Sequence, residues 1–309
     1  MNGKTALLFA GQGAQYVGMG RDLAESDPGA REWFERANRV LGYDLATVCF
    51  EGPDDVLTRT EHAQPGIFLV GWIAWQLLRA RCPRFQFQAT AGLSLGEFTA
   101  LAAAGALSFE DGLRLVRIRG QLMQAACERA DGAMAAIIGL DEAATRAVCE
   151  EAGVAMANLN CPGQIVISGA RGALEKAVEL AKGRGARRAV LLNVAGAYHS
   201  PLMAPAQPGL REALASVEVH PPRVPVISNV TARPHEDPES IRNRLVEQVT
   251  APVLWEASMR HLLAQGFTRF VELGPGTVLS GFLRRIQKDV EVYNVADTAS
   301  LQATANALA

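Results

Sequence analysis

The strongest constraint on how this chain can fold is a short glycine-rich turn between a strand-like and a helix-like segment. Residues 92–97, GLSLGE, match the pattern G-x-S-x-G, with Ser94 between two glycines. Residues 85–92 are typical of a strand, and the alanine-rich residues 95–104 are typical of a helix. In this context the pattern predicts a sharp turn that presents a strained, outward-pointing serine as a nucleophile. The alternative is an ordinary turn in which Ser94 only caps the helix.

Strand-like and helix-like segments alternate along most of the chain. Residues 5–10 predict a buried strand, and residues 64–82 predict a helix with Pro65 in its first turn, where proline is tolerated. A second helix is predicted over 108–129 from the start signal S-x-x-D. Further strands are expected in VPVISNVT, FTRFVEL and VEVYNV, whereas the final LQATANALA is only weakly patterned. The alternation predicts an α/β fold with a hydrolase-like, parallel-sheet large domain formed by residues 1–130 and 196–309.

Residues 131–195 follow a different pattern and predict an inserted small domain. Between AMAAII and RRAVLLNV the expected order is strand, helix, strand, strand, helix, strand. That order is typical of a ferredoxin-like unit. Because the β/α alternation resumes afterwards, we expect this unit to interrupt the large domain.

A serine hydroxyl needs a base before it becomes a useful nucleophile, and the chain offers five histidines. Four lie in positions that indicate no catalytic role. His220 and His235 are expected on the loop surface, His261 in a charged helix, and His62 at the start of a helix. His199 instead follows a predicted strand, in a turn of small residues that ends at a proline. Open α/β sheets build their sites at the ends of strands, so His199 is the candidate base. The alternative is a turn histidine with a structural hydrogen bond.

An arginine on an apolar helix face is the third candidate. Within helix 108–129, the residues three and four positions from Arg119 are all apolar: Leu115, Val116, Leu122 and Met123. Arg114 and Arg117 have polar or charged neighbours and are expected to be solvated. A buried guanidinium needs a partner, and its planar fork suits a carboxylate. That carboxylate is either an internal Asp or Glu or the free acid of an acyl substrate.

Composition excludes several other classes of function. The formal net charge of −2 makes nucleic acid an unexpected partner. The five cysteines show no CxxC or Cys/His metal spacing, which predicts reduced thiols and no metal site. The N-terminal apolar run is too short for a membrane span, and no signal-peptide pattern follows it. We therefore expect a cytoplasmic protein that does not bind membranes.

Five motifs in order resemble those of malonyl-CoA:acyl carrier protein transacylases, and the likeness spans nearly the whole chain. They are GQGAQ at 11–15, GLSLGEFTAL at 92–101, RIRGQLM at 117–123, GAYHSPLM at 196–203 and QVTAPVLW at 248–255. Each motif is weak alone, but the five together are highly specific. The resemblance implies a malonyltransferase of type II fatty acid synthesis.

The resemblance also implies a role for each matching residue. Ser94 corresponds to the acyl-accepting serine, His199 to its base, and Arg119 to the arginine that binds the malonyl carboxylate. Gln12 and Leu95 correspond to the positions whose backbone amides form the oxyanion hole. Gln248 corresponds to a glutamine whose main-chain carbonyl orients the histidine, so no acidic third member is expected.

Two positions concern the family's substrate pocket. Leu93 replaces the histidine that usually precedes the serine, and it can neither hydrogen-bond nor change charge there. Tyr198 stands where malonyl-selective members usually have phenylalanine. An aromatic ring at this position narrows the pocket and is expected to disfavour a branched methylmalonyl unit.

The expected reaction is a ping-pong transfer of malonyl from malonyl-CoA to the phosphopantetheine thiol of an acyl carrier protein. We expect no cofactor beyond the coenzyme A thioester substrate, and a monomeric enzyme. Three alternatives remain open: a discrete acyltransferase of a polyketide synthase, a serine thioesterase or esterase, and a non-catalytic scaffold that binds a carrier protein.

Overall fold

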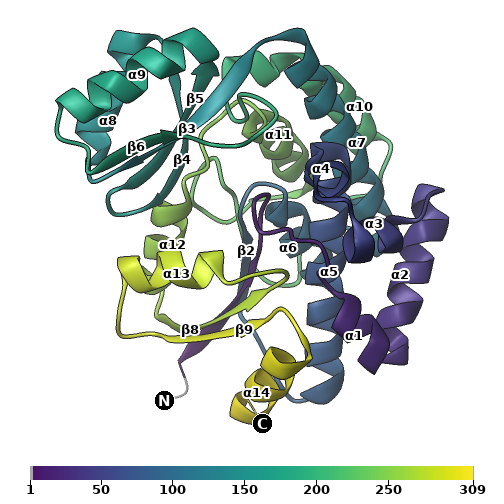
Figure 1. Cartoon of the computed structure of the whole chain (residues 1–309). Helices are drawn as coiled ribbons and strands as arrows, with labels where there is room; N and C mark the ends of the chain where they lie inside the picture. Colours follow the sequence, from purple (N-terminus) through teal and green to yellow (C-terminus); the bar gives the residue numbers. More distant parts are fainter. Residues whose placement is uncertain (1–2, 309) are drawn as a thin grey trace.

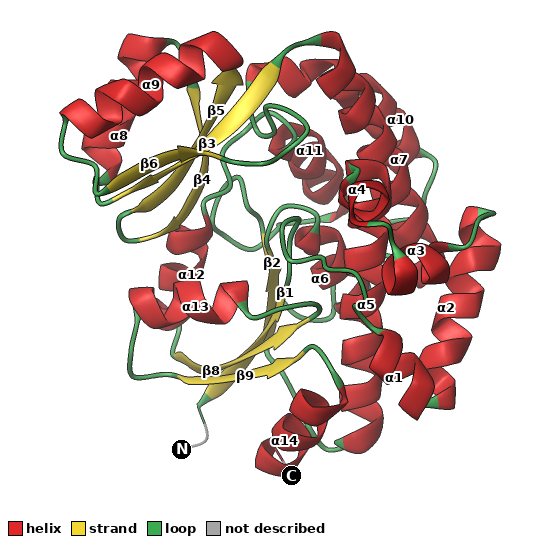
Figure 2. Ribbon diagram, in the orientation of Figure 1, coloured by secondary structure: helices red, strands yellow, loops and turns green. Residues whose placement is uncertain are grey.

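The computed structural model describes residues 3–308 and contains two sheets (Figures 1 and 2). The larger sheet has the strand order β7-β2-β1-β8-β9, and all of its neighbouring strands are parallel. Its strands are β1 (Lys4–Phe9), β2 (Ala89–Gly92), β7 (Val226–Ile227), β8 (Phe267–Leu273) and β9 (Glu291–Val295). The α/β fold with a parallel sheet is therefore as the sequence predicts.

Helices cover both faces of the larger sheet because both faces of its central strand are apolar. Leu7 and Phe9 of β1 belong to the same buried cluster as α5 and α7, whereas Ala6 and Leu8 pack with Trp255 and α12 on the other side. The helices of this part are α1 (Arg21–Ser26), α2 (Pro28–Leu41), α3 (Leu45–Glu51), α4 (Asp54–Thr58), α5 (Thr60–Arg81), α6 (Gly96–Ala103), α7 (Phe109–Arg129), α10 (Gln207–Ala215), α11 (Pro238–Gln248), α12 (Trp255–Ala264), α13 (Val278–Ile286) and α14 (Thr298–Leu308).

The second sheet is antiparallel and has the strand order β4-β5-β3-β6. Its strands are β3 (Gly132–Ile138), β4 (Ala155–Cys161), β5 (Gln164–Ala170) and β6 (Arg188–Leu191), and its helices are α8 (Glu142–Ala152) and α9 (Arg171–Gly183). Alternate residues of β3, such as Ala135 and Ile137, pack under α8 and α9 in a separate core. Figure 1 shows these helices on the face away from the larger sheet, so the other face is turned towards it.

Helix α7 begins as its sequence signal predicts. The Ser108 hydroxyl caps the helix by accepting the amide of Asp111 at 3.0 Å. Arg119 lies on the buried face, as the periodicity predicts, and is 1% exposed.

Two expectations about the helices are wrong. Helix α5 begins at Thr60, one turn before the predicted start, so Pro65 lies inside the helix. The weakly patterned C-terminal segment is helical up to Leu308, with Leu301 and Ala305 buried. The last residue of that segment, 309, lies outside the described residues.

The internal proline also explains why Arg117 is not solvated as expected. Proline has no N–H, so Pro65 cannot donate to the carbonyl of Glu61 four residues earlier. Arg117 Nη1 donates to that carbonyl at 2.7 Å, and its guanidinium lies over the ring of Tyr43. Its side chain is 20% exposed, compared with 52% for Arg114.

No helix within residues 3–308 is long and apolar enough to cross a membrane. All five cysteines are buried and free, as the reduced-thiol prediction requires.

We expect Arg117→Met to lower the free energy of unfolding by about 1–2 kcal/mol, because it leaves a partly buried carbonyl without a donor. Arg114→Met removes a comparable charge from a more exposed site of the same helix and should change stability by less than about 0.5 kcal/mol. Urea unfolding of both variants measures the difference. Equal losses would show that the Glu61 carbonyl does not depend on Arg117.

Candidate active site

Ser94 lies in the strained turn that the G-x-S-x-G pattern predicts. Its φ is 54°, in the left-handed region that side chains rarely adopt, and it stands between β2 and α6. A Cβ on Gly92 would lie 1.9 Å from the carbonyl oxygen of Gly96, and a Cβ on Gly96 would lie 2.3 Å from that of Phe9. Only glycines allow the turn to close this tightly against the end of β1.

His199 comes from a distant loop and contacts the serine directly. Its Nε2 lies 2.8 Å from Ser94 Oγ, and its Nδ1 lies 2.8 Å from the main-chain oxygen of Gln248. A carbonyl can only accept, so Nδ1 carries the proton and Nε2 is left with a lone pair facing the hydroxyl. His199 also has a positive φ, 57°. Nucleophile and base are thus both held in uncommon backbone conformations.

The imidazole of His199 is kept neutral by its surroundings. Burial and the nearby positive charge of Arg119 lower its pKa to about 4, against the weaker opposing effect of the hydrogen bond to Gln248. A neutral imidazole can accept the serine proton throughout the neutral pH range.

Arg119 is buried beside the serine and has three hydrogen-bond acceptors. Its Nη1 donates to Gln64 Oε1 at 2.7 Å, and its Nη2 donates to Ser94 Oγ and to Gln248 Oε1, each at 3.0 Å. Across residues 3–308, no carboxylate forms an ion pair with this guanidinium. Burial lowers its pKa to about 10, opposed by the charge of Glu97, so the side chain remains a cation at neutral pH. An internal Asp or Glu partner, one of the two alternatives left open by the sequence, is therefore not in contact with it.

These groups open onto one cavity of about 570 Å³. Its wall includes five of the seven residues singled out from the sequence, namely Gln12, Ser94, Arg119, Tyr198 and His199. The second sheet contributes Met134, Asn158 and Val166, so both sheets line the cavity. Leu93 also lines it, which places an apolar side chain where the family usually has histidine.

The backbone amides of Gln12 and Leu95 are candidate oxyanion donors. Within the described part of the chain, neither amide is used in a backbone or side-chain hydrogen bond outside the regular elements. The Gln12 side chain is anchored by the Thr60 hydroxyl, which donates to its Oε1 at 2.8 Å. A Cβ on Gly11 would lie 2.5 Å from the carbonyl oxygen of Leu93, so the loop that carries Gln12 packs directly on the serine turn.

Gln248 lies behind the cavity wall and contacts several parts of the site. It is fully buried at the end of α11. Its main-chain oxygen faces His199, its side-chain oxygen faces Arg119, and its amide nitrogen donates to Ser94 O at 3.1 Å. The prediction from the resemblance concerned only the main-chain oxygen.

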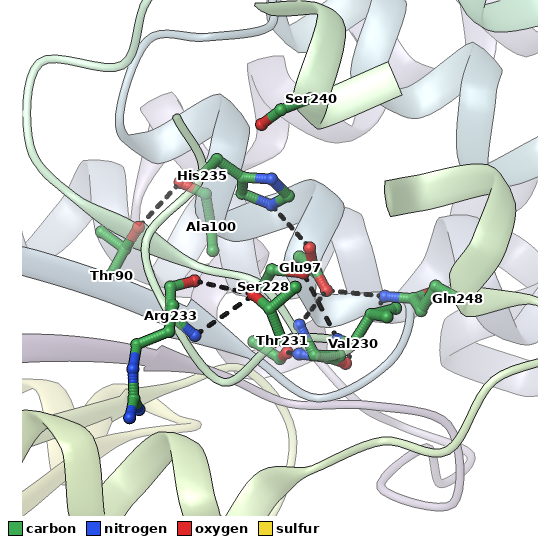
Figure 3. Close-up of polar contacts among 12 residues, drawn as sticks. Thr90, Glu97, Ala100, Ser228, Val230, Thr231, Arg233, His235, Ser240 and Gln248 are labelled. Carbon is green, nitrogen blue, oxygen red and sulfur yellow. Dashed lines mark hydrogen bonds and ion pairs between the residues drawn. The ribbon is translucent and has the colours of Figure 1, made fainter. Parts of the chain in front are cut away.

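Sequence reasoning missed the acidic and amide groups behind the serine. Asn229 Oδ1 accepts the Ser94 amide at 2.6 Å, and Asn229 Nδ2 donates to Gly92 O at 2.8 Å. Glu97 is fully buried, and Figure 3 shows it between His235 and Gln248. The expectation that His235 is a surface histidine is wrong, because its side chain is 0% exposed and its Nε2 lies 2.7 Å from Glu97 Oε1. The sequence signal that could have indicated Glu97 is its place three residues after Ser94, at the end of the G-x-S-x-G turn and the start of the following helix.

No group of three or more His, Cys, Asp or Glu residues that could hold a metal ion occurs among residues 3–308. The polar groups of the cavity instead suit an acyl transfer: a nucleophile, a neutral base, free amides and a cation that can bind a carboxylate.

Comparison with known proteins agrees with this chemistry. The acyl transferase domain family matches residues 6–307. The chain is 43% identical over 304 residues to the malonyl CoA-acyl carrier protein transacylase of Bacillus subtilis, covering 97% of this chain and 95% of that protein. It is 44% identical to the malonyl-CoA:acyl carrier protein transacylase of Xanthomonas oryzae, whose crystal structure matches with a TM-score of 0.95 over 100% of this chain and 99% of that one. A malonyl-transacylase solved in complex with a type II polyketide synthase acyl carrier protein matches with a TM-score of 0.95 and 37% identity over 98% of this chain and 99% of that one.

We expect His199 to titrate near pH 4 and to titrate higher, between 4 and the ordinary 6.5, in Arg119→Met. The sign follows from charge: Arg119 disfavours the imidazolium, so removing it favours protonation. NMR titration of the imidazole signals measures both values, and His199→Gln identifies the signal by its loss. Arg114→Met is the matched control and should leave the pKa unchanged. A wild-type value of 6.5, or no rise in Arg119→Met, would contradict this account.

Proposed function

The chain belongs to the acyl transferase family, among the malonyl-CoA–acyl carrier protein transacylases, and from this premise we propose that Ser94 carries a malonyl group from coenzyme A to an acyl carrier protein. The observation that carries this conclusion is that three side chains meet at one point. Ser94 Oγ lies 2.8 Å from the neutral imidazole of His199 and 3.0 Å from the buried guanidinium of Arg119. The product, a malonylated carrier protein, supplies fatty acid synthesis.

The first half-reaction forms a malonyl ester on the serine. Ser94 Oγ attacks the thioester carbonyl while His199 Nε2 accepts its proton. The carbonyl oxygen becomes an oxyanion, which the amides of Gln12 and Leu95 stabilise. When the tetrahedral intermediate collapses, the C–S bond breaks and His199 returns the proton to the coenzyme A thiolate.

Arg119 selects the acyl group. Its hydrogen bond to Ser94 Oγ at 3.0 Å supports this role, because a malonyl carboxylate bound to the same guanidinium stays next to the serine. Its protein partners there are neutral amide and hydroxyl oxygens, which do not cancel the charge, and its buried Nε has no hydrogen-bond partner among the described residues. A fixed carboxylate also holds the ester in one pose and leaves little room for water.

The second half-reaction reverses the first with a different thiol. The phosphopantetheine thiol of the carrier protein gives its proton to His199, and the thiolate attacks the malonyl-serine ester. His199 then returns the proton to Ser94 Oγ as the C–O bond breaks. The ring of Tyr198 lines the same cavity and limits its width, which disfavours a branched methylmalonyl group.

Further parts of the proposal concern the enzyme as a whole. The chemistry requires no metal and no cofactor beyond the coenzyme A thioester, and we assign the enzyme to the cytoplasm as a monomer. We assign residues 131–195 to a ferredoxin-like small domain, inserted between the two parts of a hydrolase-like domain formed by residues 1–130 and 196–309. The strand order of the second sheet supports this division.

A second candidate is the same transfer in polyketide synthesis. The observation that favours it is the similarity to a malonyl-transacylase solved with a polyketide carrier protein. Rates of malonyl transfer to purified fatty acid and polyketide carrier proteins distinguish the two pathways.

Incubation with malonyl-CoA should add the mass of one malonyl group to the intact wild-type protein. Ser94→Ala should gain none, because the ester has no oxygen to form on. Intact-mass spectrometry measures both, with Ser108→Ala as a control that removes a hydroxyl from a helix cap outside the cavity. A wild-type protein that never gains mass would instead support the carrier-protein scaffold.

Arg119→Ala should lower the rate of malonyl loading by about a hundredfold or more, since it removes a charge-assisted pair with the substrate. Loading of acetyl from acetyl-CoA should fall much less, because that acyl group has no carboxylate. Arg114→Ala should alter neither rate. Equal losses for the two acyl groups would favour the thioesterase or esterase alternative, in which the arginine has no role in selection.

A further inference from the structure

A buried carboxylate lies directly behind the serine and takes no part in the proposed reaction. Glu97 lies in the first turn of α6 and has 0% of its surface exposed. It accepts hydrogen bonds from His235 Nε2 at 2.7 Å and from Gln248 Nε2 at 2.8 Å (Figure 3). It also accepts one from the backbone N–H of Asn229 at 2.9 Å. Burying a carboxylate is costly without such donors, so three of them imply a specific task.

The contact with Gln248 links Glu97 to the substrate-binding arginine. The Gln248 amide has an accepting end and a donating end, and only one orientation suits its neighbours. Its Nε2 faces the acceptors Glu97 Oε2 and Ser94 O, which leaves Oε1 facing Arg119 Nη2 at 3.0 Å. The reversed amide would bring N–H groups against the guanidinium and an oxygen against the carboxylate.

His235 in turn holds the carboxylate in place. Its Nδ1 is buried and has no hydrogen-bond partner among the described residues, whereas its Nε2 faces Glu97. Leaving a buried N–H without an acceptor costs more free energy than leaving a lone pair without a donor, so the geometry favours the tautomer that carries its proton on Nε2 and donates it to Glu97. This contact holds the carboxyl group of Glu97 one amide away from the buried guanidinium.

A second branch runs from Glu97 to the serine turn through Asn229. The backbone N–H of Asn229 donates to Glu97. The side chain of Asn229 accepts from the Ser94 backbone N–H and donates to the carbonyl oxygen of Gly92. This branch supports the nucleophile itself, so its loss affects every acyl group equally. Asn229 Oδ1 also faces Gln248 Nε2, but at 3.4 Å, compared with 2.8 Å for Glu97 Oε2, so Glu97 is the nearer acceptor that orients this amide beside Arg119.

We propose that Glu97, held by His235, is a positioning residue that fixes the amide of Gln248 with its oxygen towards Arg119 and thereby sets the preference for acyl groups that carry a carboxylate. The inference rests on the proposed function, because it assigns a determinant of substrate choice to the same site.

The test compares the kcat/KM of Ser94 loading for malonyl-CoA and for acetyl-CoA in the full-length protein. Glu97→Ala should lower the malonyl-to-acetyl ratio by about tenfold, since it removes a charge-assisted hydrogen bond. Glu97→Gln should keep the ratio within about threefold, because an amide oxygen can still accept from Gln248 and the imidazole can change tautomer. A role that is merely structural would lower both rates together and leave the ratio unchanged.

A double-mutant cycle tests whether the effect passes through Gln248. Gln248→Ala keeps the main-chain oxygen for His199 but removes the amide, and it should lower the ratio at least as far as Glu97→Ala. Adding Glu97→Ala to Gln248→Ala should lower it no further. Independent, multiplying effects would overturn the proposal.

The matched control is Glu272→Ala. Glu272 is also fully buried, accepts two backbone amides at the start of α13 and makes no contact with Gln248 or Arg119. Glu272→Ala should destabilise the protein as much as Glu97→Ala does, but it should leave the malonyl-to-acetyl ratio unchanged. If Glu97→Ala does not fold, Glu97→Asp retracts the carboxylate while keeping its charge, and it should also lower the ratio. An unchanged ratio in Glu97→Asp and Glu97→Ala with normal wild-type malonyl loading overturns this inference alone, whereas absent wild-type loading overturns the proposed function.

Discussion

The site depends on a buried positive charge that has no anionic partner in direct contact among residues 3–308. Arg119 is 1% exposed, and its acceptors are the neutral oxygens of Gln64, Ser94 and Gln248. Such an arrangement is costly in an isolated interior, since neutral acceptors solvate a charge without cancelling it. The fold tolerates it because the carboxylate of Glu97 lies one amide away. A carboxylate entering the cavity therefore finds a cation that is already desolvated and already held in position.

The catalytic geometry also requires backbone strain that the surrounding packing must hold. Ser94 and His199 both have positive φ values, which an isolated chain would avoid. The serine turn is held by glycines packed against β1 and by Asn229, which bonds the chain on both sides of it. The histidine is held by a main-chain oxygen of Gln248. The residues that bind Arg119 and those that hold the strain are thus partly the same.

Local signals in the sequence predicted the features that depend on near neighbours. The pattern around Ser94 predicted the strained turn, the S-x-x-D signal predicted the cap of α7, and periodicity placed Arg119 on the buried face. Of the features that depend on distant neighbours, the resemblance predicted the contact of Ser94 with His199, 105 positions away, but others were missed. Glu97 and His235 are 138 positions apart, so nothing near His235 indicates that it is buried. Arg117 looked solvated because its partner, the carbonyl freed by Pro65, belongs to another helix.

The absence of an acid from the Ser94–His199 pair follows from the same buried charge. A carboxylate at His199 Nδ1 would raise the pKa of the imidazole, but it would also attract Arg119 and compete with the substrate's own carboxylate. A main-chain carbonyl fixes the same tautomer without adding charge. The cost is a pKa held near 4, partly by Arg119 itself. In the proposed mechanism a bound malonyl carboxylate offsets that charge, so the base regains part of its strength when an acyl group that carries a carboxylate occupies the cavity. One guanidinium therefore selects the substrate in this mechanism and, together with burial, sets the strength of the base.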